Sequence, residues 1–168
     1  MEVRDATLDD LPGILEIFND AIVNTTSVWR DAPEDLAIRR RWFEARRTRE
    51  FPVLVAAEGN EVLGFGSYGD FRMFDGYRHT VEHSVYVRGG RRRAGLGRTL
   101  LLALVDRARQ QRMHAMIGGI EASNQASLAL HATLGFREVA RMPEVGCKFG
   151  RWLDLVFMQR LLDSREMP

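Results

Sequence analysis

The 168-residue sequence lacks a second cysteine, a long apolar run and a signal-peptide pattern, and each absence excludes a class of protein. Cys147 is the only cysteine, so a domain held together by internal disulfides is excluded. No apolar run reaches the roughly 18 residues of a membrane-spanning helix, and the charged start from Met1 to Asp5 does not resemble a signal peptide. We therefore expect a cytoplasmic protein without a membrane partner.

The sequence also lacks a strong charge of either sign. The formal net charge is +1, and Lys148 is the only lysine among 24 basic residues. A chain so close to neutral does not predict a broad basic face for nucleic acid. The histidines do not show a recognised zinc-ligand spacing, so we expect no metal; they are His79, His83, His114 and His131.

The hydrophobic pattern predicts one α/β (α+β) domain over residues 1–163, with a short tail at 164–168. An amphipathic stripe predicts a helix from Leu11 to Ile22, and Thr7-x-x-Asp10 resembles a capping box before it. Alternation predicts strands, and a further stripe at Leu100 and Leu104 predicts another helix. We expect strands at 3–6, 51–57, 62–68, 81–87, 115–120, 136–141 and 152–162, helices at 11–22, 33–47, 97–108 and 124–134, and loops at 70–79 and 142–151.

The order of these elements predicts a mixed central sheet flanked by helices, because it combines hairpins with crossover connections. One turn carries most of the functional information. Arg92-Arg93-Ala94-Gly95-Leu96-Gly97 lies between a predicted strand and a predicted helix. Glycines allow close backbone approach, arginines match phosphate oxygens, and a helix N-terminus favours an anion. The turn therefore predicts a pyrophosphate site, although a basic glycine turn is also an ordinary strand-to-helix connection.

The motif R-x-x-G-x-G resembles the acetyl-CoA-binding turn of the GCN5-related N-acetyltransferases, the GNAT superfamily. Residues 124–136, N-Q-A-S-L-A-L-H-A-T-L-G-F, resemble the later signature of the same superfamily at the expected distance. A narrower resemblance rests on residues 24–26, 76–87 and 148–154. It is to the phosphinothricin and methionine sulfoximine acetyltransferase branch. These enzymes acetylate the α-amine of glutamate-like or methionine-derived compounds, are linked with antibiotic or herbicide resistance, and are usually homodimers.

The resemblance implies a GNAT fold, and it implies acetyl-CoA as the co-substrate. Backbone groups near Val85 would meet the thioester and the pantetheine arm, and one N–H would stabilise the oxyanion. Asn124 would bind the pantetheine amides or cap its helix, and it could do both, because capping uses the side-chain oxygen and leaves the NH₂ group free. The implied cofactor-binding residues are Val85, Tyr86, Val87, Arg92, Arg93, Ala94, Gly95, Leu96, Gly97, Arg98, Asn124 and Ser127.

Two residues are candidates for proton transfer. Glu82 is three residues before Val85, and a carboxylate there could accept the proton of the substrate ammonium. The alternative is a structural ion pair with Arg78 or Arg72. His131 takes the position at which many relatives carry a tyrosine acid, and the alternative is a histidine packed against the core.

The loop before the Glu82 strand predicts the substrate site. Arg72 and Arg78 suit a carboxylate or a phosphinate, and Phe74 lies between them. The substrate-binding candidates are thus Arg72, Phe74, Arg78 and Glu82, with Trp29, Phe51, Lys148 and Trp152 as candidates for the pocket wall or a dimer contact.

Direct transfer in a ternary complex to methionine sulfoximine, methionine sulfone or phosphinothricin is the expected activity. Two alternatives stay open: acetylation of peptide or polyamine amines, and a non-catalytic sensor that binds acetyl-CoA without turnover. The two arginines of the loop argue against a polyamine, but they do not argue against a peptide.

Overall fold

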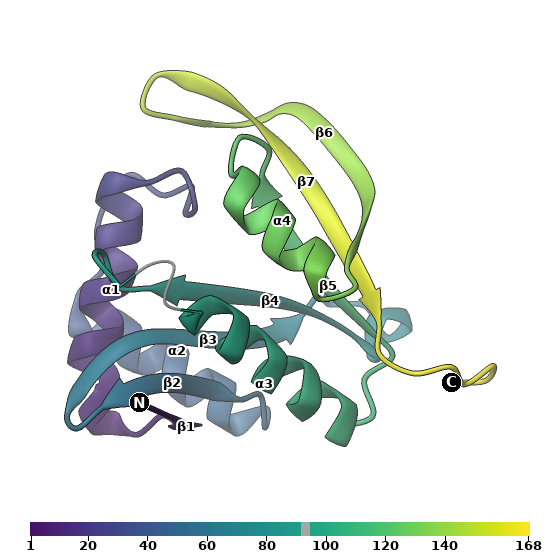
Figure 1. Cartoon of the computed structure of the whole chain (residues 1–168), viewed down its shortest axis with the longest axis horizontal. Helices are drawn as coiled ribbons and strands as arrows, with labels where there is room; N and C mark the ends of the chain where they lie inside the picture. Colours follow the sequence, from purple (N-terminus) through teal and green to yellow (C-terminus); the bar gives the residue numbers. More distant parts are fainter. Residues whose placement is uncertain (92–94) are drawn as a thin grey trace.

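The structure is a computed structural model that describes residues 1–91 and 95–168. In that part of the chain, seven strands form one mixed sheet with helices on both faces (Figure 1). The strands are β1 (Glu2–Asp5), β2 (Val53–Glu58), β3 (Glu61–Asp70), β4 (Thr80–Val87), β5 (Ala115–Glu121), β6 (Arg137–Lys148) and β7 (Arg151–Leu161). Their order is β1-β2-β3-β4-β5-β7-β6, in which β4 and β5 pair in parallel. The predicted mixed sheet is confirmed.

The same described ranges contain four α-helices and two short 3₁₀ turns. These are α1 (Leu11–Asn24), α2 (Leu36–Thr48), α3 (Leu96–Gln110) and α4 (Gln125–Thr133), with 3₁₀ turns at Leu8–Asp10 and Asp75–Tyr77. The predicted capping box is present before α1, where the Thr7 N–H donates to Asp10 Oδ2 at 2.8 Å. None of the helices that the structure describes is long and apolar enough to cross a membrane.

The sheet separates two hydrophobic cores. On one face, α3 packs Leu100 and Leu104 against Val81 and Met116, and the end of α4 adds Leu134. On the other face, α1 and α2 cover the strands of the N-terminal half; their contacts include Ile14, Phe43, Val55, Val62 and Phe65. Residues of β2 contribute alternately to the two cores, as the period of a strand requires.

One prediction about the C-terminal half was wrong. Residues 142–148 were expected in a loop, because Pro143 and Gly146 favour turns, yet they belong to β6. β6 is an edge strand, where a proline costs no ladder hydrogen bond, and its register shifts between Met142 and Gly146. The β6–β7 hairpin is therefore long, and it rises above the rest of the molecule (Figure 1).

Candidate active site

The parallel pairing of β4 and β5 stops partway along both strands. Cα partners run from Thr80 with Ala115 to His83 with Gly118, although β4 continues to Val87 and β5 to Glu121. Residues 84–87 are also partly exposed, although β4 lies in the middle of the sheet. We call the two unpaired stretches, 84–87 and 119–121, the β4–β5 fork. Each has one backbone edge free for an extended ligand.

The backbone of β4 directs specific groups toward the fork. The Arg88 N–H donates to the Leu63 carbonyl at 2.8 Å, which orients Arg88 toward β3. Because these groups alternate along a strand, the N–H and C=O of Tyr86 also point toward β3, and those of Val85 and Val87 point toward the fork. The structure therefore separates the three predicted backbone contacts: Val85 and Val87 face the fork, and Tyr86 contributes its side chain to the α1 side, edge-on to Phe18.

Helix α3 begins beside this region with a glycine in a left-handed conformation. Gly95 has φ 79° and its carbonyl accepts the first helical hydrogen bond, from the Thr99 N–H at 3.0 Å. A residue with a Cβ is disfavoured at this φ. The first-turn amides of α3, at Leu96, Gly97 and Arg98, have no intrahelical partner and point toward the helix N-terminus. The other predicted residues of this turn, Arg92, Arg93 and Ala94, lie outside the described residues.

Helix α4 begins at the β5 side of the fork. Asn124 caps it, because its Oδ1 accepts from the Ser127 N–H at 3.1 Å. The capping alternative for Asn124 is thus correct, and its side-chain NH₂ group can still donate to a ligand. Asn124 and Ser127 both lie in the first turn of α4, close in sequence to the end of the fork at Glu121.

Glu82 lies on β4, on the sheet face that α1 and α2 cover. Its Oε1 lies over Gly119, where an added Cβ would come within 3.1 Å, and the same spot is close to Leu155 and Phe157. Burial raises the pKa of the Glu82 carboxyl, and the positive charge of Arg72 opposes that increase. Within the described residues, no ion pair joins Glu82 to Arg72 or Arg78 within 4.0 Å. The carboxyl is thus half-buried and has a raised proton affinity, as a base for an ammonium requires.

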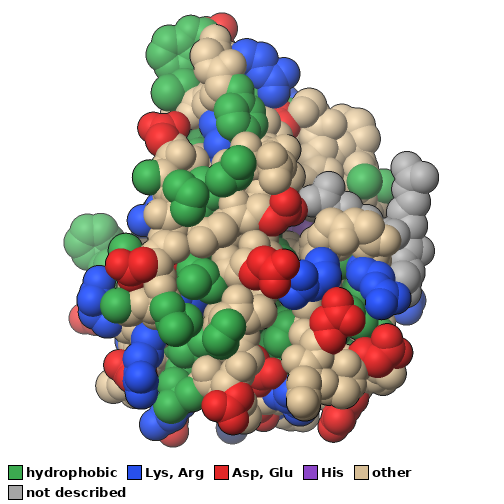
Figure 2. All heavy atoms as spheres, turned by 90° about the vertical axis from the view of Figure 1, so that its left-hand side faces the viewer, with side chains coloured by type: hydrophobic (Ala, Val, Ile, Leu, Met, Phe, Trp, Pro, Cys, Tyr) green, Lys and Arg blue, Asp and Glu red, His purple; other side chains and the backbone are tan. Residues whose placement is uncertain are grey.

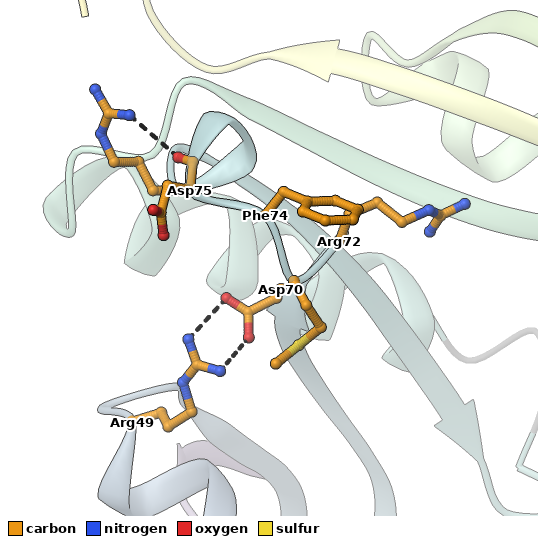
Figure 3. A pocket seen from close by; sticks show the side chains of 7 residues that line it. Arg49, Asp70, Arg72, Phe74 and Asp75 are labelled. Carbon is orange, nitrogen blue, oxygen red and sulfur yellow. Dashed lines mark hydrogen bonds and ion pairs between the residues drawn. The ribbon is translucent and has the colours of Figure 1, made fainter.

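The predicted substrate loop lines a shallow pocket (Figure 3). Arg49 and Asp70 line this pocket as an ion pair, in which Arg49 Nη2 donates to Asp70 Oδ1 at 3.0 Å. Arg72 extends away from this ion pair, and its guanidinium carbon lies 4.1 Å from the centroid of the Phe71 ring. Arg78 donates instead to the Asp75 carbonyl at 3.1 Å. The two predicted arginines therefore line one pocket, but their guanidinium groups do not converge. Of the two, Arg72 is the one whose positive charge opposes the rise that burial causes in the pKa of Glu82.

His131 is buried, which agrees with the alternative prediction of a histidine packed against the core. Its Nδ1 lies 2.7 Å from the Ser127 carbonyl, and its Nε2 lies 3.2 Å from Nε2 of His83. The ring also packs edge-on against Phe136. Burial lowers the pKa of His131, and the hydrogen bond to the Ser127 carbonyl opposes that decrease.

Sequence reasoning missed three buried contacts around the site. Glu121, at the end of β5, accepts from Thr26 Oγ1 at 2.8 Å. Lys148 donates from Nζ to the carbonyls of Ile22, Thr25 and Val28. The third contact is that of His83 with His131. From the sequence, His83 was considered only as a possible zinc ligand, and its place in the alternation of β4 was the one signal that its side chain faces inward. The loop after α1 is thereby attached to both β5 and the β6–β7 hairpin.

Comparisons with known proteins agree with this architecture. Residues 14–136 match the Acetyltransferase (GNAT) family. The chain is 57% identical over 168 residues to an L-methionine sulfoximine/L-methionine sulfone acetyltransferase of Pseudomonas paraeruginosa, covering 99% of this chain and 98% of that one. It is 36% identical to a phosphinothricin N-acetyltransferase of Alcaligenes faecalis, covering 96% of this chain and 81% of that one.

A solved structure matches the whole fold. The putative acetyltransferase yncA of Salmonella typhimurium, solved with its cofactor acetyl-CoA, superposes with a TM-score of 0.97 at 49% identity. The match covers 99% of this chain and 96% of that one. With a family match over most of its length and relatives above half identity, the chain belongs to the GNAT family of acetyltransferases.

Proposed function

We propose that this acetyltransferase moves the acetyl group of acetyl-CoA to the α-amine of a small amino-acid-like substrate of the methionine sulfoximine, methionine sulfone or phosphinothricin type. The observation that carries the proposal is the β4–β5 fork with Glu82 beside it. The names of the relatives at 57% and 36% identity support the substrate class. A TM-score of 0.97 to a protein solved with acetyl-CoA supports the co-substrate.

The fork suits the pantetheine arm of acetyl-CoA. Val85 and Val87 would bind it as an added strand, and Asn124 and Ser127 would meet it from the first turn of α4. The α3 amides at Leu96, Gly97 and Arg98, beyond Gly95, would bind the pyrophosphate, together with Arg92, Arg93 and Ala94 of the motif. Tyr86 would contribute its ring to the wall of the site on the α1 side, and not its backbone groups, because these face β3.

Glu82 would act as the base in the transfer step. It accepts a proton from the substrate ammonium, and the neutral amine then attacks the thioester carbon. The Val85 N–H, which points into the fork, stabilises the oxyanion as the N–C bond forms and before the C–S bond breaks. Arg72 and Arg78, with Phe74 between them, would hold the acidic end of the substrate. This direct transfer needs no metal and no covalent enzyme intermediate.

The cellular setting and assembly of the enzyme belong to the same proposal. We expect a homodimer in the cytoplasm, with no nucleic-acid or membrane partner and with residues 1–163 as its one domain. Exposed apolar side chains at the tip of the β6–β7 hairpin support self-association: Phe149 is 56% exposed and Trp152 is 69% exposed. Figure 2 shows hydrophobic side chains at the top of the molecule, the end at which Figure 1 places this hairpin. A light-scattering mass of one chain at micromolar concentration would contradict the dimer.

Release of the CoA thiol from acetyl-CoA tests the proposed activity. The amine panel is methionine sulfoximine, methionine sulfone, phosphinothricin, spermidine and a short peptide. Saturable turnover with the first three and little with the others is the expected result. Turnover with the peptide or spermidine alone would contradict the substrate class. Binding of acetyl-CoA without turnover on any amine would favour the sensor alternative.

A further inference from the structure

Two buried imidazoles join the walls of the fork. His83 comes from β4 and His131 from α4, and they are 8% and 6% exposed. Their rings lie 5.1 Å apart at an interplanar angle of 19°, with Nε2 atoms 3.2 Å apart. Phe136 packs against both rings. This contact links positions 48 residues apart in the sequence.

The hydrogen bonds fix which nitrogen carries each proton. The Ser127 carbonyl can only accept, so His131 Nδ1 carries a hydrogen and donates to it across 2.7 Å. Burial lowers the pKa of both imidazoles, which favours their neutral forms at neutral pH. A neutral imidazole has one N–H, so His131 Nε2 is then a bare acceptor. His83 Nε2, 3.2 Å away, must then be the donor, and His83 Nδ1 is bare. In agreement, His83 Nδ1 is buried and has no hydrogen-bond partner among the described residues.

The pair lies where the two strands separate. His83 is opposite Gly118 in the last pair of the β4–β5 ladder. A Cβ added to Gly118 would lie 2.9 Å from His83 Nε2 and 3.1 Å from His131 Nε2. Gly118 therefore leaves the space in which the two nitrogens meet. Among the described residues, no ladder pairing joins β4 to β5 beyond this point, and the histidine pair is a side-chain contact between β4 and α4 at the closed end of the fork.

We propose that His83 is a positioning residue for acetyl-CoA. Its Nε2–H holds His131 Nε2 in the last turn of α4, and the bond from His131 Nδ1 to the Ser127 carbonyl carries that restraint to the first turn, so both are fixed relative to the free edge of β4. This inference rests on the proposed function, because it assigns the fork to acetyl-CoA. Asn124 and Ser127 lie on the α4 side and Val85 on the β4 side. Loss of the link would let these two sets of groups drift apart.

The same link gives His131 a part other than the predicted acid. Its one N–H is held by the Ser127 carbonyl, and its other nitrogen accepts from His83. In this arrangement no N–H of His131 is free to donate to the departing thiolate. The reaction supplies that proton itself: the nitrogen loses two protons in passing from ammonium to amide, the thiolate takes up one, and the other goes to solvent.

Nitrogen NMR of the histidine side chains tests the proton assignment directly. The protein is labelled with ¹⁵N-histidine, and His83→Gln and His131→Gln identify the signals. The expected result at neutral pH is a protonated Nδ1 and a bare Nε2 in His131, with the reverse in His83. A protonated Nε2 in His131 would overturn the proposal. This measurement needs no substrate, so it stands apart from any failure of the proposed activity.

Kinetics of His83 variants test the positioning role. His83→Phe keeps a planar aromatic ring and removes the donor, which leaves His131 Nε2 buried and unpaired. The KM for acetyl-CoA should therefore rise about tenfold, with the amine KM unchanged. His83→Gln restores an N–H donor and should return the acetyl-CoA KM to within about twofold of the wild-type value. His79→Phe, a half-exposed histidine just before β4, is the matched control.

Two outcomes would overturn the positioning role. One is an acetyl-CoA KM in His83→Phe equal to the wild-type value, with any loss confined to kcat. A residue needed only for folding would give that result. The other is a KM in His83→Gln as high as in His83→Phe. If His83→Phe does not fold, the His83→Gln kinetics and the wild-type NMR measurement decide.

Discussion

Replacement of Lys148 by methionine should strongly destabilise the protein. The Lys148 side chain is 4% exposed, and its Nζ donates to Thr25 O at 2.7 Å and to the carbonyls of Ile22 and Val28. Burial lowers the pKa of the Lys148 ammonium, but its three N–H groups satisfy three carbonyls near the end of α1. Methionine keeps the apolar length of the side chain and leaves those carbonyls without a donor.

The magnitude follows from these three bonds. An unpaired buried polar group costs about 1–3 kcal/mol, so three carbonyls without donors would cost about 3–9 kcal/mol, and relief of the desolvation of the buried ammonium offsets part of that loss. We take about 4 kcal/mol, which is a large part of the ~5–15 kcal/mol that stabilises an ordinary domain. At about 2–4 °C per kcal/mol for a chain of this size, Tm should fall by about 8–16 °C.

Urea unfolding and thermal unfolding of Lys148→Met measure this loss. Arg151→Met is the matched control, because Arg151 pairs with Lys148 across the hairpin turn and is exposed. That control should change stability by less than about 0.5 kcal/mol. A loss in Lys148→Met no larger than in Arg151→Met would refute the reasoning, because it would mean that the carbonyls find other donors.

Two further predictions concern stability. Gly118→Ala should lower the free energy of unfolding by about 1–3 kcal/mol, measured in urea, because the added Cβ would meet the buried Nε2 atoms of His83 and His131. Gly76→Ala is the control and should be neutral, because nothing lies within 4 Å of a Cβ added there. Equal effects of the two changes would contradict the packing at Gly118. Glu82→Gln should gain stability over wild type as pH rises from about 4 to 8: burial raises the folded-state pKa of Glu82, so its favourable contribution is complete below the unfolded-state pKa and is lost as pH rises through the folded-state value. A stability of Glu82→Gln that falls relative to wild type as pH rises, in urea unfolding, would contradict this sign.

Local patterns predicted most of the fold. The stripe of α1, the capping box at Thr7 and the β2–β3 hairpin each depend on residues within a few positions of one another, and all three are present. The length of β6 was not predictable in this way. Pro143 and Gly146 read locally as turn residues, and only the edge position of β6 in the sheet makes them acceptable in a strand.

The candidate site likewise contains features that short motifs predict and contacts that they do not predict. The glycine turn at Gly95 and the cap at Asn124 carry short motifs, so the sequence located both. The contacts of His83 with His131 and of Thr26 with Glu121 span 48 and 95 residues, and no local pattern records such pairs. The two loop arginines line one pocket, yet their separate hydrogen bonds depend on the fold of the 3₁₀ turn at Asp75–Tyr77, which no local pattern indicated.

The pH dependence of kcat/KM in wild type and Glu82→Gln, with acetyl-CoA affinity measured beside it, tests the central claim most directly. Glu58→Gln, an exposed carboxylate at the end of β2, is the matched control. The account predicts an unchanged acetyl-CoA Kd in Glu82→Gln, a fall in kcat/KM of about 100-fold or more, and a rising limb displaced to higher pH, toward the pKa of the free amine. A Glu82→Gln enzyme with the rate and pH profile of Glu58→Gln would contradict it.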